Sequence, residues 1–129
     1  MSRKPASRGR APELASTRRP AGSFAWSCAL VVFAATFLVF KSALDGGWLD
    51  WDDAPLLREN EAWRGFSFAH LRWMFTTFHM GPYQPLSWMS YAFDHALWGM
   101  EPRGYHLTNL LLHAGTATCL FFLAREIFE

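Results

Sequence analysis

Residues 21–40 read AGSFAWSCALVVFAATFLVF and contain no charged side chain. A helix of these 20 residues rises about 1.5 Å per residue and so covers the roughly 30 Å hydrocarbon core of a bilayer. A second uncharged run occupies residues 106–124. The two runs predict two transmembrane helices joined by a long loop. The first run is too long for the apolar part of a signal peptide, and no small-x-small cleavage site follows it, so we expect a retained anchor.

The distribution of charge gives the expected topology. Residues 1–20 hold six basic residues and one acid, whereas the loop holds five basic and eight acidic residues. The positive-inside rule therefore places the N-terminus in the cytoplasm and the loop outside it. We expect a multi-pass protein of a bacterial inner membrane, with five segments. These are a disordered basic cytoplasmic tail (1–20), transmembrane helix 1 (21–40), an extracytoplasmic aromatic and acidic loop (41–105), transmembrane helix 2 (106–124) and a truncated cytoplasmic end (125–129).

The loop is unusually rich in aromatic residues, since it contains six of the seven tryptophans. Ser67 is a typical N-cap, and the apolar residues after it recur at helical spacing until Gly81-Pro82. A second helix is expected between Pro85 and Gly99. We predict that both are interfacial amphipathic helices, and for any single aromatic residue we favour lipid contact and packing over a specific functional role. The expected fold class is an all-α membrane protein with two transmembrane helices and interfacial helices in the extracytoplasmic loop.

The second uncharged run is less apolar than the first. His106, Asn109 and His113 fall on one helix face, and residues 114–118 are small. Polar groups inside a membrane usually face a bundle interior or a water-filled cavity, and small residues permit close helix packing. We therefore expect further transmembrane helices, from the same or another chain, as partners.

The strongest local signal for chemistry is Asp50-Trp51-Asp52-Asp53, about ten residues beyond the first run. A carboxylate there can accept a proton from an acceptor hydroxyl as a general base. A pair of carboxylates can instead hold a divalent cation through oxygen ligands. The alternative is a solvated acidic turn, and spacing alone favours that alternative. The histidines show no metal-ligand spacing, and no phosphate-binding glycine loop is present.

Several short motifs together resemble a known family, although none is specific by itself. In chain order they are Trp51-Asp52-Asp53, Glu59-Asn60, Leu71-Arg72-Trp73-Met74-Phe75, Tyr83-Gln84-Pro85-Leu86-Ser87, Tyr91-Ala92-Phe93-Asp94, Leu97-Trp98-Gly99 and the run from Gly104 to His113. Over residues 24–124 this order resembles the N-terminal region of membrane O-mannosyltransferase-like proteins that carry tetratricopeptide repeats. Those proteins are members of the C-type glycosyltransferase superfamily.

The resemblance implies sugar transfer from a polyprenyl-phosphate donor to an extracytoplasmic acceptor. It implies that Asp52 or Asp53 is the general base or a metal-associated carboxylate, and in the second case a divalent metal cation would be the cofactor. The helix from His106 through Asn109 to His113 would line the lipid-phosphate side of the site. Tyr83 and Gln84 would contact the donor, but Gln84 replaces a basic residue or histidine, which weakens that expectation.

Two functions remain open from the sequence. The first is an N-terminal fragment of a membrane glycosyltransferase, inactive as an isolated chain because further spans and repeats are missing. The alternative is a non-catalytic anchor or assembly module whose loop binds lipid or a protein partner. The expected partners are a lipid-linked sugar donor and membrane lipid, with no nucleic acid.

Overall fold

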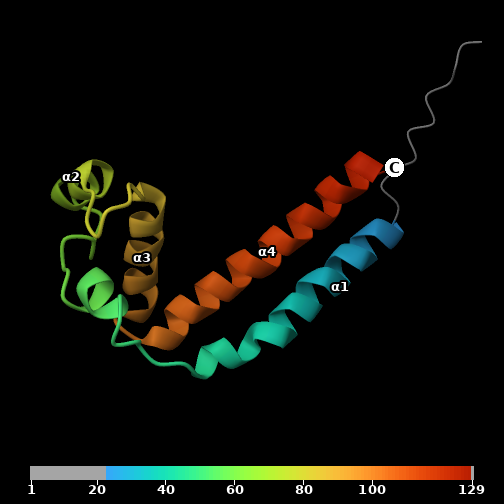
Figure 1. The fold of residues 1–129 in the computed structure, drawn as a ribbon, viewed down its shortest axis with the longest axis horizontal. Coiled ribbons are helices and arrows are strands. Elements are labelled where there is room, and N and C mark those ends of the chain that lie inside the picture. Colours follow the sequence, from blue (N-terminus) through green and yellow to red (C-terminus); the bar gives the residue numbers. More distant parts are fainter. Residues whose placement is uncertain (1–22, 129) are drawn as a thin grey trace, which may run out of the picture.

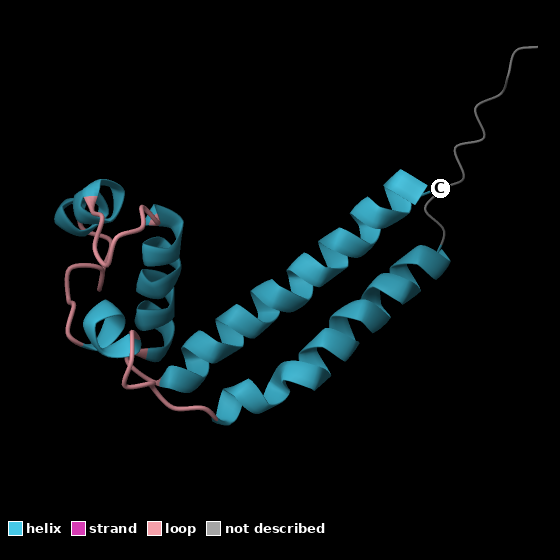
Figure 2. Ribbon diagram, viewed as in Figure 1, coloured by secondary structure: helices cyan, strands magenta, loops and turns pink. Residues whose placement is uncertain are grey.

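The computed structural model describes residues 23–128, which form helices and connecting loops with no β-strand (Figures 1 and 2). Two long antiparallel helices make a hairpin, and the segment between them folds into a separate lobe at one end of it (Figure 1). In chain order the elements are α1 (Ser23–Phe40), a 3₁₀ turn η1 (Lys41–Asp45), a π-helical turn η2 (Ala54–Arg58), α2 (Phe68–Thr76), α3 (Pro85–Trp98) and α4 (Pro102–Phe128). The tail predicted for residues 1–20 lies outside the described residues.

The hairpin of α1 and α4 contains residues 23–40 of the first uncharged run and all of the second. It provides the two candidate membrane-spanning helices, Phe24–Asp45 and Pro102–Phe128. Small side chains lie at the contact, because Ala25, Ala29 and Ala114 are buried between the helices. Small residues let two helix backbones approach closely. Most of the exposed side chains of the hairpin are apolar, as expected for helices surrounded by lipid.

The helices extend beyond the predicted spans. Helix α4 begins at Pro102, four residues before the predicted start, and continues to Phe128. Proline suits the first turn of a helix because its missing N–H has no partner there anyway. At the same end of the hairpin as Pro102, η1 continues directly from α1. The helical segments are therefore longer than the uncharged runs by which the sequence identifies them.

The lobe between the spans packs around its own aromatic core. Trp63, Met74 and Trp88 are fully buried, and Leu57 and Tyr105 are nearly so. The rings of Trp73 and Trp88 are 5.0 Å apart between centroids, and those of Trp63 and Tyr105 are 6.4 Å apart. Burying such large rings is a major source of stability in a small unit. Part of the aromatic content that predicted a membrane surface is therefore used for internal packing.

Helix α2 starts where the sequence predicts and ends earlier. Ser67 is the N-cap, and its side-chain oxygen accepts a hydrogen bond from the backbone N–H of His70. The helix ends at Thr76 because Thr77 is extended and its hydroxyl accepts from the His79 backbone N–H at 3.1 Å. Such a local side-chain turn competes with helix continuation. Helix α3 runs from Pro85 to Trp98 as predicted, and Gly99 follows it with a positive φ of 61°.

Ser67→Ala should loosen the start of α2. Loss of an N-cap hydroxyl costs about 1 kcal/mol, because one backbone N–H of the first turn loses its partner. The measurement is amide hydrogen exchange over residues 68–70 of the protein in detergent micelles. Ser87→Ala is the matched control, since Ser87 makes no side-chain hydrogen bond within the described part of the chain. Equal exchange in both variants would contradict the cap.

The lobe is fastened to the hairpin at the base of α4. The Trp48 indole N–H donates to the Met100 carbonyl at 3.2 Å, and its ring packs 5.0 Å from that of Tyr105. The Tyr105 hydroxyl donates to the Gly99 carbonyl at 2.8 Å. Gly104 has no room for a side chain, because an added Cβ would overlap Trp98. The junction between α3 and α4 is therefore closely packed rather than a flexible linker.

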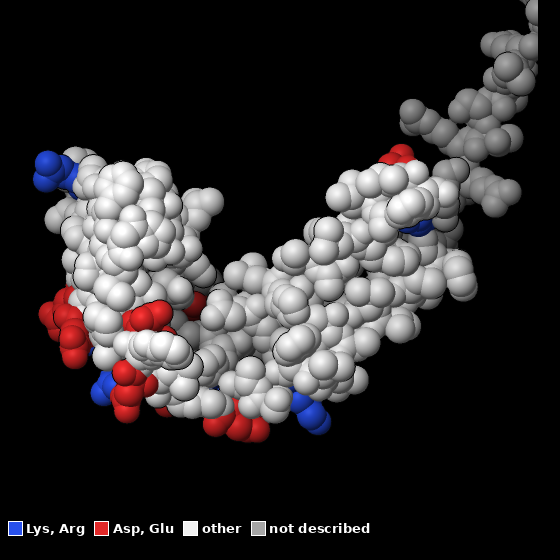
Figure 3. Space-filling view, viewed as in Figure 1, with Lys and Arg blue, Asp and Glu red and all other residues white. Residues whose placement is uncertain are grey.

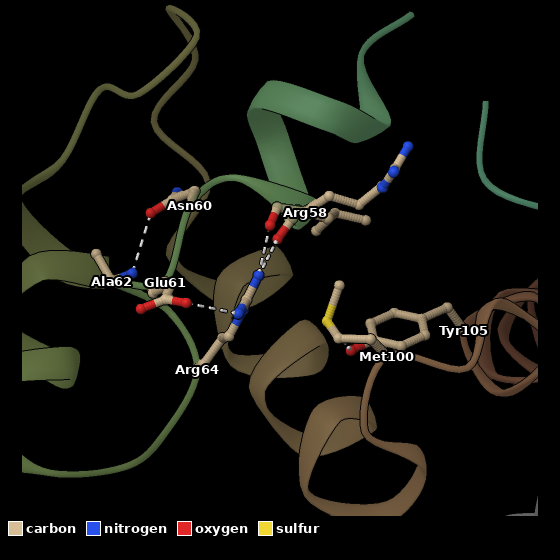
Figure 4. Close-up of polar contacts among 8 residues, drawn as sticks. Arg58, Asn60, Glu61, Ala62, Arg64, Met100 and Tyr105 are labelled. Atoms are coloured by element: carbon tan, nitrogen blue, oxygen red, sulfur yellow. Dashed lines mark hydrogen bonds and ion pairs between the residues drawn. The ribbon is translucent and has the colours of Figure 1, made fainter. Parts of the chain in front are cut away.

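Arg64 organises the turn that leads from η2 to the core. Its guanidinium donates to the carbonyls of Leu57 and Arg58 at 3.2 and 2.7 Å and pairs with Glu61 at 3.1 Å (Figure 4). These bonds close the loop that carries the buried Trp63. The Arg64 side chain thus supplies hydrogen-bond donors to two backbone carbonyls of this irregular segment.

Candidate functional site

The acidic segment lies in the connection between η1 and η2, at the lobe end of the hairpin. Asp53 is half-buried, and one of its carboxylate oxygens accepts from the Leu49 backbone N–H at 2.8 Å. Asp50 forms an exposed ion pair with Arg58 at 3.4 Å. The Asp52 side chain is exposed, while its backbone carbonyl accepts from the Leu56 N–H. Asp53 is therefore the carboxylate of this segment that the fold holds most firmly.

A divalent-cation site is not complete within the described residues. Among them no group of three or more histidine, cysteine, aspartate or glutamate side chains lies close enough to hold a metal ion. One oxygen of Asp53 is already occupied by the Leu49 N–H. Metal binding by Asp52 and Asp53 stays a prediction.

Tyr83 and Gln84, predicted to contact a donor, lie at the start of α3. The Tyr83 hydroxyl donates to the Phe75 carbonyl at 3.1 Å, and its ring packs 5.5 Å from Phe78. Gln84 is the N-cap residue of α3, and its backbone carbonyl accepts from the Trp88 N–H. These interactions join α3 to the end of α2 and include no contact with Asp52 or Asp53.

The three polar residues predicted on one face of α4 have different surroundings. The Nε2 atom of His106 is buried without a hydrogen-bond partner in the described part of the chain, and a Cβ on Gly46 would lie 3.5 Å from it. The His113 ring packs edge-on against Phe40 of α1, with centroids 5.0 Å apart. Asn109 is exposed. Of the three, His106 lies closest in the fold to the turn that precedes the acidic segment.

Asp94 is a buried carboxylate that the sequence analysis did not select. Only 1% of its surface is exposed, and it accepts a 2.5 Å hydrogen bond from the Thr108 hydroxyl of α4. Burial raises the pKa of Asp94 above its usual 3.8, and the Thr108 hydrogen bond partly offsets the rise. A signal was present, because Asp94 is the one Asp, Glu, Lys or Arg of residues 85–98, and an isolated charge in an apolar helix costs free energy unless it has a partner.

Tyr91 links Asp94 to the acidic segment. Burial raises the pKa of Tyr91 above its usual 10.0, and the negative charges of Asp53 and Asp94 raise it further. Tyr91 therefore remains a neutral phenol near pH 7, able to donate a hydrogen bond. Its ring also packs against Trp63 and Trp88 of the core. The lobe thus places Tyr91 within electrostatic reach of both Asp53 and Asp94.

The raised pKa of Asp94 predicts a specific pH dependence of stability. The folded state holds the proton more tightly than the unfolded state, so the free energy of unfolding falls as pH rises from about 3.8 through the raised pKa. Asp94→Asn should remove this contribution while its side-chain oxygen still accepts from Thr108. Thr108→Val should cost about 1–3 kcal/mol near neutral pH, because a buried carboxylate loses its donor.

The check is thermal unfolding in detergent micelles at several pH values between about 3.5 and 8, which span the usual range of carboxyl pKa values. The difference between Asp94→Asn and the unsubstituted protein should grow with pH in favour of the variant. If the difference in stability did not change with pH, the pKa of Asp94 would be the same in the folded and unfolded states, and the prediction would be wrong.

Comparison with known proteins gives one distant similarity. Over 101 residues, covering 73% of this chain, the sequence is 26% identical to the protein O-mannosyl-transferase Tmtc1 of Drosophila melanogaster. The chain spans 12% of the length of that relative. No family model matches the sequence, and no solved structure matches it. The similarity supports the predicted relationship to O-mannosyltransferase-like proteins. It does not test the predicted membership of the C-type glycosyltransferase superfamily.

Proposed function

We propose that this chain is part of a C-type glycosyltransferase that moves a sugar from a polyprenyl-phosphate donor to an extracytoplasmic hydroxyl acceptor. The observation that carries the proposal is the acidic segment beside the spans, in a chain that resembles a protein O-mannosyl-transferase. The alternative of a non-catalytic anchor has no comparable support. The polyprenyl-phosphate donor and the extracytoplasmic hydroxyl acceptor are both proposed here.

In the proposed reaction Asp53, or its neighbour Asp52, is the general base. Its carboxylate takes the proton of the acceptor hydroxyl as that oxygen bonds to the anomeric carbon of the sugar. The bond from the same carbon to the donor phosphate oxygen breaks, and polyprenyl phosphate leaves with the electron pair. The Leu49 N–H, which donates to Asp53 at 2.8 Å, fixes one carboxylate oxygen and leaves the other for the acceptor.

The proposed donor contacts are Tyr83, Gln84, His106, Asn109 and His113. His106 suits this role best, because its buried Nε2 has no partner among the described residues and lies beside the Gly46 turn. Tyr83 and Gln84 suit it less well, since they contact α2.

We also propose the membrane arrangement that this reaction needs. The N-terminus is cytoplasmic, the lobe is extracytoplasmic, and the membrane is a bacterial inner membrane. Further transmembrane helices cover part of the outward apolar surfaces of α1 and α4, since few of their residues are buried in the hairpin. Reporter fusions at residue 60 and at residue 129 should report opposite sides of the membrane.

The transfer reaction itself is the test of function. Membranes that contain the whole glycosyltransferase of which this chain is proposed to be a part are incubated with polyprenyl-phosphate mannose and a serine- and threonine-rich peptide, and the peptide mass is followed. The expected result is a donor-dependent gain of one hexose on the peptide. Absence of transfer under conditions in which the protein is folded and membrane-inserted would contradict the proposal for this donor class.

A further inference from the structure

Helix α3 has two apolar faces, and only one of them is used by the core. Trp88, Ala92 and Tyr91 lie on the core face. Leu86, Phe93 and Leu97 follow one another at i, i+7 and i+11, which places them together on the opposite face. They are 75%, 56% and 57% exposed. An ordinary surface helix of a water-soluble domain would carry charged or polar residues on that face.

The same pattern continues on α2 and on the connection to α3. Phe68 is 83% exposed, Phe78 is 67% exposed, and Phe75 is half exposed. Residues 66–98 contain two Asp, Glu, Lys or Arg side chains, the exposed Arg72 and the buried Asp94. By contrast, residues 41–65 contain nine, among them Asp45, Asp50, Asp52 and Asp53. The lobe is thus divided into a charged base and an apolar tip.

The position of the tip relative to the spans decides what covers it. Helices α3 and α4 rise from a common base, and the Pro85 end of α3 points to the same side as the body of α4 (Figure 1). Acidic side chains gather around the base, whereas the tip is almost free of charge (Figure 3). Because α4 leaves this base to enter the bilayer, the tip leans toward the bilayer and the acidic base faces away from it.

We propose that the tip, residues 66–98, is inserted into the extracytoplasmic leaflet of the membrane, with lipid covering Leu86, Phe93 and Leu97. Interfacial helices commonly bury their apolar face roughly 5–10 Å below the headgroups. Arg72, the exposed cation of the tip, suits the phosphates of lipid headgroups.

Insertion of the tip does not require the proposed catalytic function. It also differs from the arrangement in which two separate helices lie flat on the membrane surface. The lobe is a folded unit whose core is aromatic and whose tip is a third membrane-contacting element beside the two spans. The lipid is the bulk phospholipid of the leaflet. A further protein helix on the same face is the competing occupant.

Spin labels on the protein in phospholipid nanodiscs test the inference. Single cysteines replace Leu86 and Phe93 in a background with Cys28→Ser and Cys119→Ser, and the collision rates with oxygen and with a water-soluble nickel chelate are compared. Glu59→Cys at the base is the aqueous reference, and Val31→Cys in α1 is the bilayer reference. A label at Phe68 of α2 gives an independent measurement if a label on α3 disturbs its packing.

The expected result is an oxygen-to-nickel ratio at Leu86 and Phe93 that is severalfold above that at Glu59 and approaches that at Val31. A ratio equal to that at Glu59 would overturn the inference, because the tip would then be in water. Low collision rates with both reagents would also overturn it, because protein rather than lipid would cover the face.

Discussion

Asp53→Asn is expected to lower the rate of sugar transfer by about 10²- to 10⁴-fold, the usual contribution of a general base. The amide keeps the size of the side chain, and its oxygen can still accept from the Leu49 N–H at the Asp53 position. What it loses is the ability to take the proton of the acceptor hydroxyl. The effect should therefore appear in the rate constant of transfer rather than in donor binding.

The neighbouring carboxylates provide matched controls. Asp50→Asn should change the rate by less than about threefold, because Asp50 forms an exposed ion pair with Arg58 and such pairs contribute little. Asp52→Asn separates the two candidates for the base, since Asp52 has an exposed side chain with no hydrogen bond in the described part of the chain. Full activity in both Asp52→Asn and Asp53→Asn would exclude this segment as the source of the base.

The features that the sequence predicts well depend on local information. The uncharged runs identify the hairpin, Ser67 identifies the start of α2, and Pro85 and Gly99 identify the ends of α3. Each of these signals acts on the backbone within a few residues. The early end of α2 was missed because the Thr77 turn depends on a side-chain hydrogen bond that competes with the helix.

The features that the sequence does not predict depend on contacts between distant residues. Trp63, Trp88 and Tyr105 meet only when the segment folds back on itself, and apolar periodicity is the same for a face toward lipid as for one toward a core. Because α3 is apolar on both faces, no polar face shows which side is buried.

The candidate site likewise has features that the sequence predicts and features that depend on the folded structure. Distance along the chain from the first span predicts that Asp52 and Asp53 lie near the membrane surface. The difference between them, that Asp53 is half-buried and accepts a hydrogen bond from the Leu49 N–H while the Asp52 side chain is exposed, cannot be predicted from that distance.

Trp88→Ala is expected to destabilise the lobe by about 3–5 kcal/mol, the usual cost of removing a large ring from a core. Trp88 is fully buried, and its ring lies 5.0 Å from Trp73 and 6.0 Å from Tyr91, so a cavity would open between α2 and α3. Each 1.4 kcal/mol corresponds to a factor of ten, so amide protection in α2 and α3 should fall by roughly 10²-fold to several thousandfold.

Two further tryptophan variants show whether this loss comes from the core. Trp51→Ala should change protection by less than about 0.5 kcal/mol, because Trp51 is 86% exposed. Trp88→Phe should be much milder than Trp88→Ala, because it keeps most of the ring and removes an indole N–H that has no hydrogen-bond partner among the described residues. If Trp88→Ala lowered protection no more than Trp51→Ala does, lipid rather than the aromatic core would be holding α2 and α3 in place.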